Sequence, residues 1–243
     1  MADVQSAGAE QIAGRLTLAI DIGGTGLKAS VVDEAAQIVT ERVRVPTPVG
    51  ASPQELVRLL ASMVAPLGPF DRVSVGFPGV VREGRILTAP NLGNDLWKGY
   101  DLARALDIAL GKPVRLANDA DLQGLAVIAG KGVEMVITLG TGFGTGLYLD
   151  GRLGPHLELS HHPFRQGETY DQQLGNAARK AIGGMRWNKR VRKAIGNLRR
   201  LTNFDRLYVG GGNAKKIDFA LDPDVTIVSN EAGMKGGVAL WRY

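Results

Sequence analysis

The sequence lacks cysteine, lacks any long apolar run and, over one stretch, lacks acidic residues. Without cysteine there can be no disulfide bond and no thiolate-bound metal, and this favours a cytoplasmic protein. No stretch approaches the roughly 18 apolar residues that a membrane-spanning helix needs, so we expect no membrane partner. Hydrophobic residues still make up 44% of the 243 residues, which is enough to bury a sizeable core.

The first fifteen residues, MADVQSAGAEQIAGR, also lack a continuous apolar segment, and they contain Asp3 and Glu10. This composition is not that of a secretory signal peptide. We interpret residues 1–15 as a disordered tail that precedes the folded part of the chain.

Acidic residues are absent between residues 179 and 200. The stretch contains nine basic residues: Arg179, Lys180, Arg186, Lys189, Arg190, Arg192, Lys193, Arg199 and Arg200. Such a segment is either the solvated face of a helix or a surface that binds a polyanion, and the sequence leaves both interpretations open.

The first half of the chain predicts the element order β-β-β-α-β-α-β. Strands are expected at LTLAIDI (16–22), LKASVVD (27–33), QIVTERVRV (37–45), RVSVGF (72–77) and PVRLAND (113–119). Helices are expected after the capping box Ser52-Pro53-Gln54-Glu55 and at DLARALDIAL (101–110). Three consecutive strands joined by short turns predict an antiparallel meander.

The second half begins in a similar way. Strands are expected at 134–140, 145–153, 205–211 and 225–229, and helices at 170–183, 187–202 and 234–240. Two strand-turn-strand units, each with a glycine-rich turn, predict an α/β fold of two similar domains around a cleft. We expect a small N-terminal domain at 16–117 together with about 230–243, and a large C-terminal domain at 118–229.

Glycine, at 33 residues, concentrates in two turns between strands. The first turn runs from Asp21 through Gly23, Gly24 and Thr25 to Lys28, and the second is TLGTGFGTG, which contains Thr141 and Gly142. Neither turn opens a helix, so neither is a P-loop or a dinucleotide-binding turn. Backbone N–H groups and threonine hydroxyls in such turns can still bind phosphate, although each turn alone is also a plausible plain hairpin. The carboxylate of Asp21 is a candidate ligand for Mg²⁺, held through water.

Asn118-Asp119-Ala120-Asp121 directly follows a predicted strand. The carboxyl ends of strands are where α/β proteins place ligands, and phosphoryl transfer to an alcohol needs a carboxylate that accepts the hydroxyl proton. We therefore predict Asp119 as the general base and Asn118 as a hydrogen-bonding partner of a sugar hydroxyl. The alternative is that one of the two residues caps a helix.

Two further polar patches are candidates for sugar contacts. Asn91 lies in the loop Ala89-Pro90-Asn91-Leu92, and Glu158 and His161 lie in ELSHH. Zinc binding by Glu158, His161 and His162 is a weaker alternative, because neighbouring residues of an extended segment point to opposite sides.

Taken together, these motifs resemble the ROK family (repressor, open reading frame, kinase). The resemblance rests on LAIDIGGTGLKASVVD, FPGVV, APNL, NDADLQGLA, TLGTGFGTGLYLDGRL, ELSH, VGGGNAKK and EAGMKGGVALW, in this order over residues 16–242. Within the family the chain looks most similar to the polyphosphate/ATP glucokinase branch. The resemblance implies the ribonuclease-H-like fold of actin and hexokinase.

The resemblance also implies roles for individual residues. Asp119 would be the general base, and the hexose would be bound by Asn91, Asn118, Glu158, His161 and Asp171. Mg²⁺ and the donor phosphates would be bound by Asp21, Gly23, Gly24, Thr25, Lys28, Thr141 and Gly142, with Gly211 and Gly212 beside the phosphate chain. Two departures are visible: the usual ELGH is Glu158-Leu159-Ser160-His161 here, and the family's cysteine-rich zinc loop is absent, so no structural zinc is expected.

The residues and the resemblance together predict a cytoplasmic hexose kinase that phosphorylates the 6-hydroxyl of glucose, with ATP or inorganic polyphosphate as donor. A dimer is implied by the resemblance alone, and the residues themselves leave the oligomeric state open. The sequence also leaves open whether the acceptor is glucose, mannose or an N-acetylated hexose, and which donor is used. A nuclease of the same fold is a remote alternative, because nucleases do not need the two glycine-rich turns. The segment before the first strand is too short for the DNA-binding domain of the family's repressors, so no nucleic-acid partner is expected.

Overall fold

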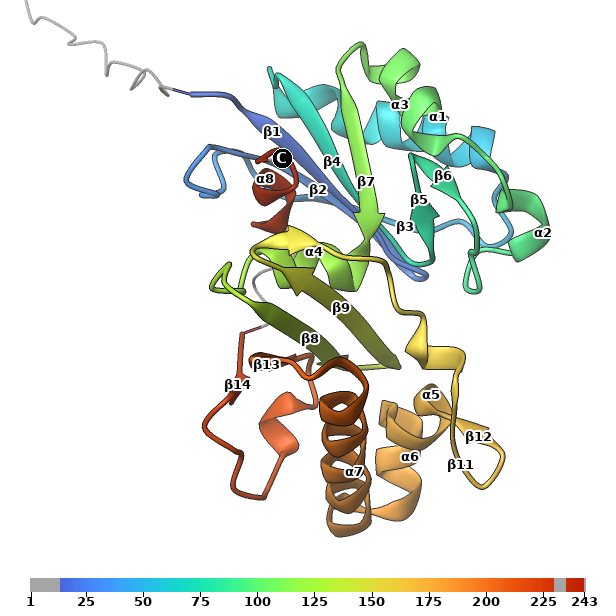
Figure 1. The fold of residues 1–243 in the computed structure, drawn as a ribbon. Helices are drawn as coiled ribbons and strands as arrows, with labels where there is room; N and C mark the ends of the chain where they lie inside the picture. The colour runs from blue at the N-terminus through green and yellow to red at the C-terminus, as the bar shows by residue number, and fades with distance from the viewer. Residues whose placement is uncertain (1–13, 230–234, 243) are drawn as a thin grey trace, which may run out of the picture.

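The computed structural model describes residues 14–229 and 235–242 and contains two five-stranded mixed sheets with helices packed against them (Figure 1). The sheet of the first half lies in the upper part of Figure 1 and that of the second half in the lower part. The predicted α/β class is confirmed. No helix of the described residues is long and apolar enough to cross a membrane.

The first sheet has the strand order β3-β2-β1-β4-β7. Its strands are β1 (Thr17–Ile22), β2 (Gly26–Val32), β3 (Val43–Pro46), β4 (Arg72–Phe77) and β7 (Val114–Asn118). Strands β1, β2 and β3 pair antiparallel, as predicted, whereas β1, β4 and β7 run parallel. The third strand is shorter than expected, because only a single bridge, between Val32 and Ile38, forms within 37–42.

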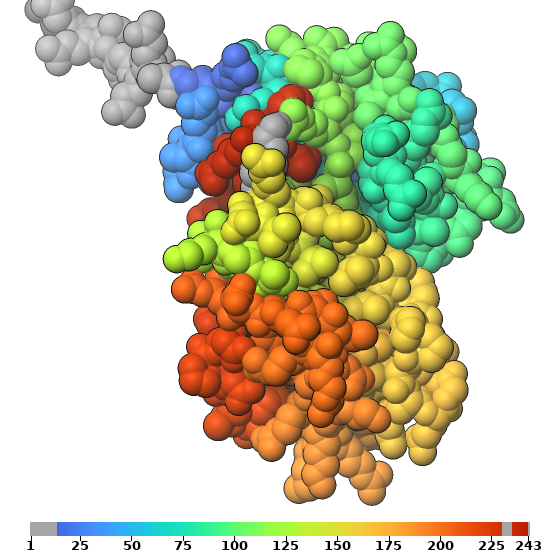
Figure 2. All heavy atoms as spheres, in the orientation of Figure 1, coloured from blue at the N-terminus to red at the C-terminus, as the bar shows by residue number. Residues whose placement is uncertain are grey.

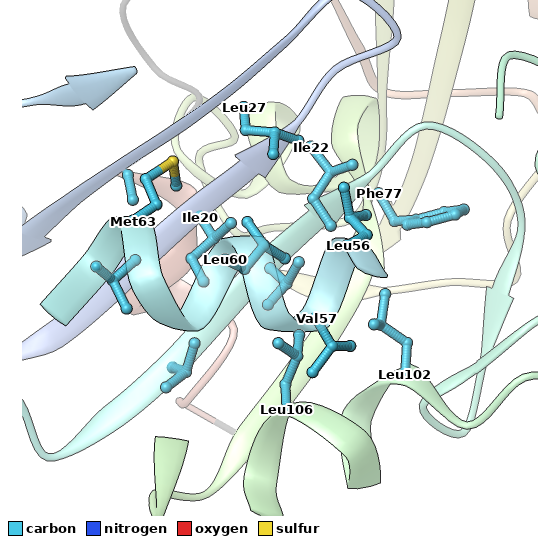
Figure 3. Packing of buried hydrophobic residues seen from close by; sticks show 14 of the residues in the cluster. Ile20, Ile22, Leu27, Leu56, Val57, Leu60, Met63, Phe77, Leu102 and Leu106 are labelled. Atoms are coloured by element: carbon cyan, nitrogen blue, oxygen red, sulfur yellow. The ribbon is translucent and has the colours of Figure 1, made fainter. Parts of the chain in front are cut away.

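Helices α1 (Pro53–Val64) and α3 (Leu102–Leu110) pack beside each other over this sheet. The predicted capping box is present, since Ser52 and Glu55 exchange hydrogen bonds at the start of α1. Leu56, Leu60 and Met63 recur at helical spacing and face the sheet, so α1 buries one apolar stripe (Figure 3). Small elements complete this half: η1 (Ala65–Leu67), β5 (Val81–Arg82), β6 (Arg85–Ile86) and α2 (Asn94–Trp97).

The second sheet repeats the same arrangement with the order β10-β9-β8-β13-β14. Its strands are β8 (Val133–Leu139), β9 (Phe143–Leu149), β10 (Arg152–Leu153), β13 (Arg206–Gly210) and β14 (Val225–Ile227). Here too the first two strands are antiparallel, and β8, β13 and β14 are parallel. The matching order supports the prediction of two similar halves.

Helices α5 (Tyr170–Leu174), α6 (Asn176–Ile182) and α7 (Gly184–Thr202) follow the second hairpin, together with η2 (Leu159–His161), β11 (Pro163–Arg165), β12 (Glu168–Thr169) and η3 (Ala214–Lys216). The single helix predicted over 170–183 is wrong, because the chain is extended at Gly175. The next N–H group, that of Asn176, donates to the carbonyl oxygens of Gly140 and Thr141 instead of continuing the helix. The break thus attaches α6 to the second glycine-rich turn.

Helix α4 (Asp119–Leu125) lies between the two sheets and contacts β4 and β7 on one side and β8 and β9 on the other (Figure 1). Helix α8 (Gly236–Ala239), near the end of the chain, packs against α4 and returns to β1 and β4. Ser74 of β4 donates to the carbonyl of Gly237 and accepts from Trp241. The domain boundaries predicted from the sequence stay predictions, and parts of them (1–13 and 230–234) lie outside the described residues.

Candidate active site

The predicted polar residues of the first half gather at one edge of its sheet. Because β1, β4 and β7 are parallel neighbours, their carboxyl ends lie side by side. Asp21 is paired with Gly76 in this register, and Phe77 is paired with Asn118. The sheet therefore brings the end of the first glycine-rich motif close to the start of the acidic segment.

Asn118 holds the start of helix α4. Its side-chain oxygen accepts from the backbone N–H groups of Ala120 and Asp121, and its amide donates to the carbonyls of Phe77 and Gly79. The helix-capping alternative is therefore realised by Asn118. Its contact with a sugar stays a prediction, and that contact would require exchange of one of these four hydrogen bonds.

Asp119 is the first residue of α4 and lies half-buried beside Gly76 of β4. A Cβ atom at Gly76 would lie 3.3 Å from the Leu122 side chain and 3.6 Å from the Asp119 Cα, so the first turns of α4 lie directly against the backbone of β4. Burial, and then the negative charge of Asp21, raise the pKa of Asp119 to about 6. Such a carboxylate is ionised at neutral pH and is a stronger base than an ordinary aspartate.

The first glycine-rich turn projects from the same edge. The N–H of Gly23 donates to the carbonyl of Gly26 at 3.0 Å, and the Thr47 hydroxyl donates to the carbonyl of Gly23 at 2.6 Å. These bonds fix the turn while Gly24 and Thr25 at its tip stay exposed. The tip is therefore free to bind an anion through its N–H groups.

Asp21 and Lys28 form an ion pair of 3.1 Å across the hairpin that carries this turn. Asp21 is partly exposed, and a single carboxylate with open space beside it suits Mg²⁺, which keeps several waters and binds phosphate oxygens. Within residues 14–229 and 235–242 no group of three His, Asp or Glu side chains could hold a metal ion by itself. A magnesium site here would need ligands from the donor phosphates and water.

Asn91 lies next to the first turn. A Cβ atom at Gly24 would lie 3.2 Å from the Asn91 Cβ, so a larger residue at position 24 would push against the asparagine. Asn91 is exposed. The structure thus brings a predicted sugar ligand and a predicted phosphate ligand together.

The second glycine-rich turn is surrounded by Asp171, Gly211 and Asn213. The Asp171 carboxylate accepts from the Phe143 N–H at 2.5 Å, and a Cβ atom at Gly142 would lie 2.6 Å from it. Gly211, with a φ of +91°, lies against the backbone of Leu139, where no side chain fits. Asn213 donates to the carbonyl of Gly140. Thr141 and Gly212 remain exposed beside this cluster.

Helix α4 connects the two turns. A Cβ atom at Gly144, two residues after Gly142, would lie 3.0 Å from the Ala120 Cβ. Ala120 is the neighbour of Asp119 in the chain. The charge of Asp21, near the first turn, helps to raise the pKa of Asp119, so this carboxylate is also close to the first turn. The predicted base therefore lies between the two predicted phosphate-binding turns.

A chain of polar side chains starts near Asp119; Asp121 and His156 are largely buried in it, whereas Glu158 and Ser160 are partly exposed. The His156 ring contacts Asp121 at 2.9 Å with one nitrogen and Glu158 at 3.5 Å with the other, and Ser160 also donates to Glu158. Burial lowers the pKa of His156, but its contacts with the two carboxylates outweigh this and raise it to about 9. The protonated ring therefore links α4 to the loop that carries the predicted sugar ligand Glu158.

His156 and Asp121 are site residues that the sequence did not identify. They are 35 positions apart in the sequence, so no spacing pattern could have paired them. The one available signal for Asp121 was its position two residues after Asp119, on the same helix. His161 and His162, by contrast, are exposed, and the His162 ring lies against the carbonyl of Pro163. Burial raises the pKa of Asp171, and the Phe143 N–H and the nearby His161 oppose this, so the two predicted sugar ligands His161 and Asp171 lie near each other.

Comparison with known proteins identifies the family. The model of the ROK family matches residues 17–165, which include both glycine-rich turns, Asp119 and the Glu158 loop. The chain belongs to the ROK family. The predicted family is thereby confirmed, and the kinases among the relatives described next confirm the predicted class, a phosphotransferase.

Two groups of curated relatives are similar to the chain. A polyphosphate glucokinase of Mycobacterium tuberculosis is 30% identical over 208 residues, covering 82% of this chain and 78% of the relative. An N-acetylmannosamine kinase of Citrobacter koseri is 40% identical over 144 residues, but this covers only 56% of this chain and 49% of the relative.

Solved structures agree with the predicted fold. An inorganic polyphosphate/ATP-glucomannokinase from Arthrobacter sp. strain KM is 32% identical, with a TM-score of 0.80 over 93% of this chain and 97% of that one. A ROK family glucokinase from Streptomyces griseus, in complex with glucose and AMPPNP, has a TM-score of 0.72 at 21% identity over 93% and 97% of the two chains. The predicted actin/hexokinase-like fold is confirmed.

Proposed function

We propose that the chain is a hexose kinase that transfers a phosphoryl group from polyphosphate or ATP to the 6-hydroxyl of glucose. The observation that carries this proposal is the position of Asp119, a carboxylate with a pKa raised to about 6, between two glycine-rich turns. The names of the relatives support the substrate class, since they include polyphosphate glucokinases and a polyphosphate/ATP-glucomannokinase.

In the proposed reaction Asp119 accepts the proton of the sugar hydroxyl as that oxygen attacks the terminal phosphorus. The new P–O bond forms while the bond to the leaving phosphate chain breaks, so no covalent enzyme intermediate is needed. Asn118 fixes Asp119 by capping the helix that begins with it. Asn91, Glu158, His161 and Asp171 would hold the hexose, which is a task for hydrogen-bonding side chains at fixed positions.

The two turns would bind the donor. Thr25 and Gly24 of the first turn and Thr141 and Gly142 of the second offer N–H and hydroxyl donors to phosphate oxygens. A Mg²⁺ ion beside Asp21 would neutralise charge that develops on the transferring group. Lys28, which pairs with Asp21, would stay near the phosphates as a second cation.

A second acceptor class is favoured by the similarity to N-acetylmannosamine kinases, whose identity of 40% exceeds that to the glucokinases over a shorter region. Glucose and N-acetylmannosamine differ in both the substituent and the configuration at carbon 2, and the residues around the sugar must accommodate this difference. A panel of glucose, mannose, N-acetylglucosamine and N-acetylmannosamine, each with ATP and with polyphosphate, separates them through the sugar phosphate formed.

The base is tested by Asp119→Asn, which keeps the shape of the side chain but removes its ability to accept a proton. We expect kcat to fall by about 10²–10⁴-fold, with the dissociation constant of glucose, measured by calorimetry, changed less than tenfold. Normal turnover at saturating sugar would contradict the assignment. The exposed His162→Gln variant, in the neighbouring loop, serves as the control and should keep its kcat.

A further inference from the structure

A surface hollow of about 390 Å³ lies beside helix α7 and is lined by basic side chains. The lining residues are Arg165, Arg186, Lys189, Arg190 and Lys193. The four on α7 follow the spacing i, i+3, i+4 and i+7, so they share one face of the helix. Arg165 comes from β11, outside the basic stretch of the sequence.

The opposite face of α7 explains why these side chains point outward. Its apolar residues Trp187, Val191, Ala194, Ile195 and Leu198 are buried in the core of the second half. The segment around 160–175 and α7 lie side by side in the lower part of the molecule (Figure 2, yellow to orange). The hollow is therefore a fixed feature of two packed elements.

The charge of the hollow is poorly neutralised. Among the ion pairs of residues 14–229 and 235–242, none involves the five lining cations. Burial, and then the charge of Arg165, lower the pKa of Arg190, while Glu168 opposes this. Gln173 holds both arginines, since its side-chain oxygen accepts from Arg165 and its carbonyl from Arg190. Like charges kept together in this way favour a bound anion.

Helix α5 connects the hollow to the candidate active site. Asp171 on this helix contacts the Gly142 turn, whereas Gln173, two residues later, contacts Arg165 and Arg190 of the hollow. Residues two apart lie on nearly opposite sides of a helix, so the two places are separated by about one helix diameter, ~10–12 Å. A linear anion that starts at the turn can reach the hollow if it is longer than a triphosphate.

We infer that this hollow, formed by α7 and Arg165, binds the distal part of an inorganic polyphosphate chain whose terminal phosphate lies at the glycine-rich turns. The inference rests on the proposed function and adds to it a second binding site outside the catalytic cleft. Lysine and arginine bind phosphate groups through charge and hydrogen bonds, and counterions released from a polyanion add to the affinity.

The chemistry of the hollow favours polyphosphate over a nucleic acid. Single-stranded nucleic acids are bound by cationic grooves combined with aromatic side chains on which bases stack. The lining of the hollow contains no aromatic residue. A polymer that consists only of phosphates provides negative charge and hydrogen-bond acceptors, and these are the interactions that the five cationic side chains can make.

The test compares two double variants that remove the same charge. Lys189→Gln/Lys193→Gln changes the hollow, and Lys180→Gln/Arg200→Gln changes two exposed residues that do not line it. Affinity for long-chain polyphosphate is measured by calorimetry without sugar, at several salt concentrations. For the hollow variant we expect affinity at least ~10-fold below that of the control, and a salt dependence reduced by about two charges.

Several outcomes of the binding measurements would overturn the inference. The first is equal loss of affinity in both double variants, which would mean a general effect of net charge. The second is an unchanged affinity in the hollow variant. The third is binding of a single-stranded oligonucleotide at the same site with equal or higher affinity. The variant Lys189→Arg/Lys193→Arg, which keeps the charge, should retain the affinity, and its loss would also speak against the inference.

Donor assays separate this inference from the proposed function. The hollow variant should raise KM for long-chain polyphosphate but not for tripolyphosphate, which is too short to reach the hollow, and an equal rise for both would overturn the inference. If the unaltered protein used no polyphosphate at all, the proposed donor would be wrong, and the binding measurement would still decide whether the hollow holds the polymer.

Discussion

At the scale of single residues, the carboxylate proposed as the general base, that of Asp119, carries an energetic cost at neutral pH. Its pKa is raised from 3.8 to about 6, so the folded state binds the proton more tightly than the unfolded state. Stability should therefore be lost as the pH rises from about 4 through 6, because the buried carboxylate then ionises. Residues held in such an environment are typical of functional sites.

Asp119→Asn should therefore stabilise the protein at pH 8 while it abolishes most turnover. The expected gain in the free energy of unfolding has an upper bound of about 3 kcal/mol, which corresponds to the pKa difference. Urea denaturation at pH 8 and pH 4 checks this, and the gain should shrink at pH 4, where the carboxyl is protonated in the folded state and close to half protonated in the unfolded state. An Asp119→Asn variant that is less stable than the unaltered protein at pH 8 would contradict the raised pKa.

The pH dependence of activity gives a separate prediction. The kcat/KM of the unaltered enzyme should fall tenfold per pH unit below about pH 6.

His156 yields a prediction with the opposite pH dependence. Contacts with Asp121 and Glu158 raise its pKa to about 9, so its contribution to stability is complete below about pH 6.5 and is lost as the pH rises through 9. His156→Gln should therefore destabilise the protein more at pH 6 than at pH 10. The lost positive charge should also raise the pKa of Asp119 further, which shifts the acidic limb of the kcat/KM profile upward.

The exposed His162→Gln is the matched control for this variant and should change neither the stability nor the pH profile. A shift of the acidic limb is informative because loss of folding alone would lower activity without moving it. If the profile of His156→Gln coincides with that of the unaltered protein, His156 does not act on the base.

Single residues also show how far the sequence alone could lead. The positions of Asp119, Asp21 and the two turns at strand ends could be predicted, since strand ends followed by Asp or by glycines carry a local signal; their roles stay predictions. For Asn118 the sequence left a sugar contact and a helix cap open; the structure shows the cap at the start of α4, and the sugar contact stays a prediction. The contact between His156 and Asp121 depends on how β9 and its following loop pack against α4, which no local pattern records.

At the scale of elements, the close packing of α8 against α4 depends on glycine. A Cβ atom at Gly236 would overlap the carbonyl oxygen of Leu122, so only glycine fits at this crossing. Gly236→Ala should cost about 1–3 kcal/mol of stability or more, as overpacking does. Gly184 also occupies the first position of a helix, and a Cβ atom there meets nothing within 4 Å. Thermal denaturation of Gly184→Ala, the matched control, should show an unchanged or slightly higher Tm.

Element boundaries were predicted where local signals are strong and were wrong where tertiary contacts compete. The capping box of α1 and the hairpin of β8 and β9 were correct. The strand predicted over 37–45 had the weakest pattern of the first three, and the single bridge at Ile38 shows that the sheet offers residues 37–42 no continuous partner. The helix over 170–183 fails at Gly175 because the N–H of Asn176 is used by the second glycine-rich turn.

At the scale of the whole molecule, each half has its own hydrophobic core. One cluster contains Leu18, Leu60 and Phe77 of the first half, and another contains Ile137, Trp187 and Leu207 of the second. A smaller cluster around Leu122, Tyr148 and Ala239 joins them through α4 and α8. Two large cores joined by a small one favour motion of the halves as rigid bodies.

Binding of sugar should draw the two halves together, because its predicted ligands come from both: Asn91 from the first, and Glu158 and His161 from the second. Closure would exclude water, which otherwise competes with the hydroxyl for the phosphoryl group.

X-ray scattering tests this closure. We expect glucose to lower the radius of gyration by roughly 0.5–1 Å from about 18 Å. The compound 6-deoxyglucose should produce the same contraction without being phosphorylated, since closure depends on binding and not on the reacting hydroxyl. L-Glucose is the control and should have no effect. An unchanged radius at saturating glucose would mean that the halves are already closed in the free protein, and water would then have to be excluded by the site itself.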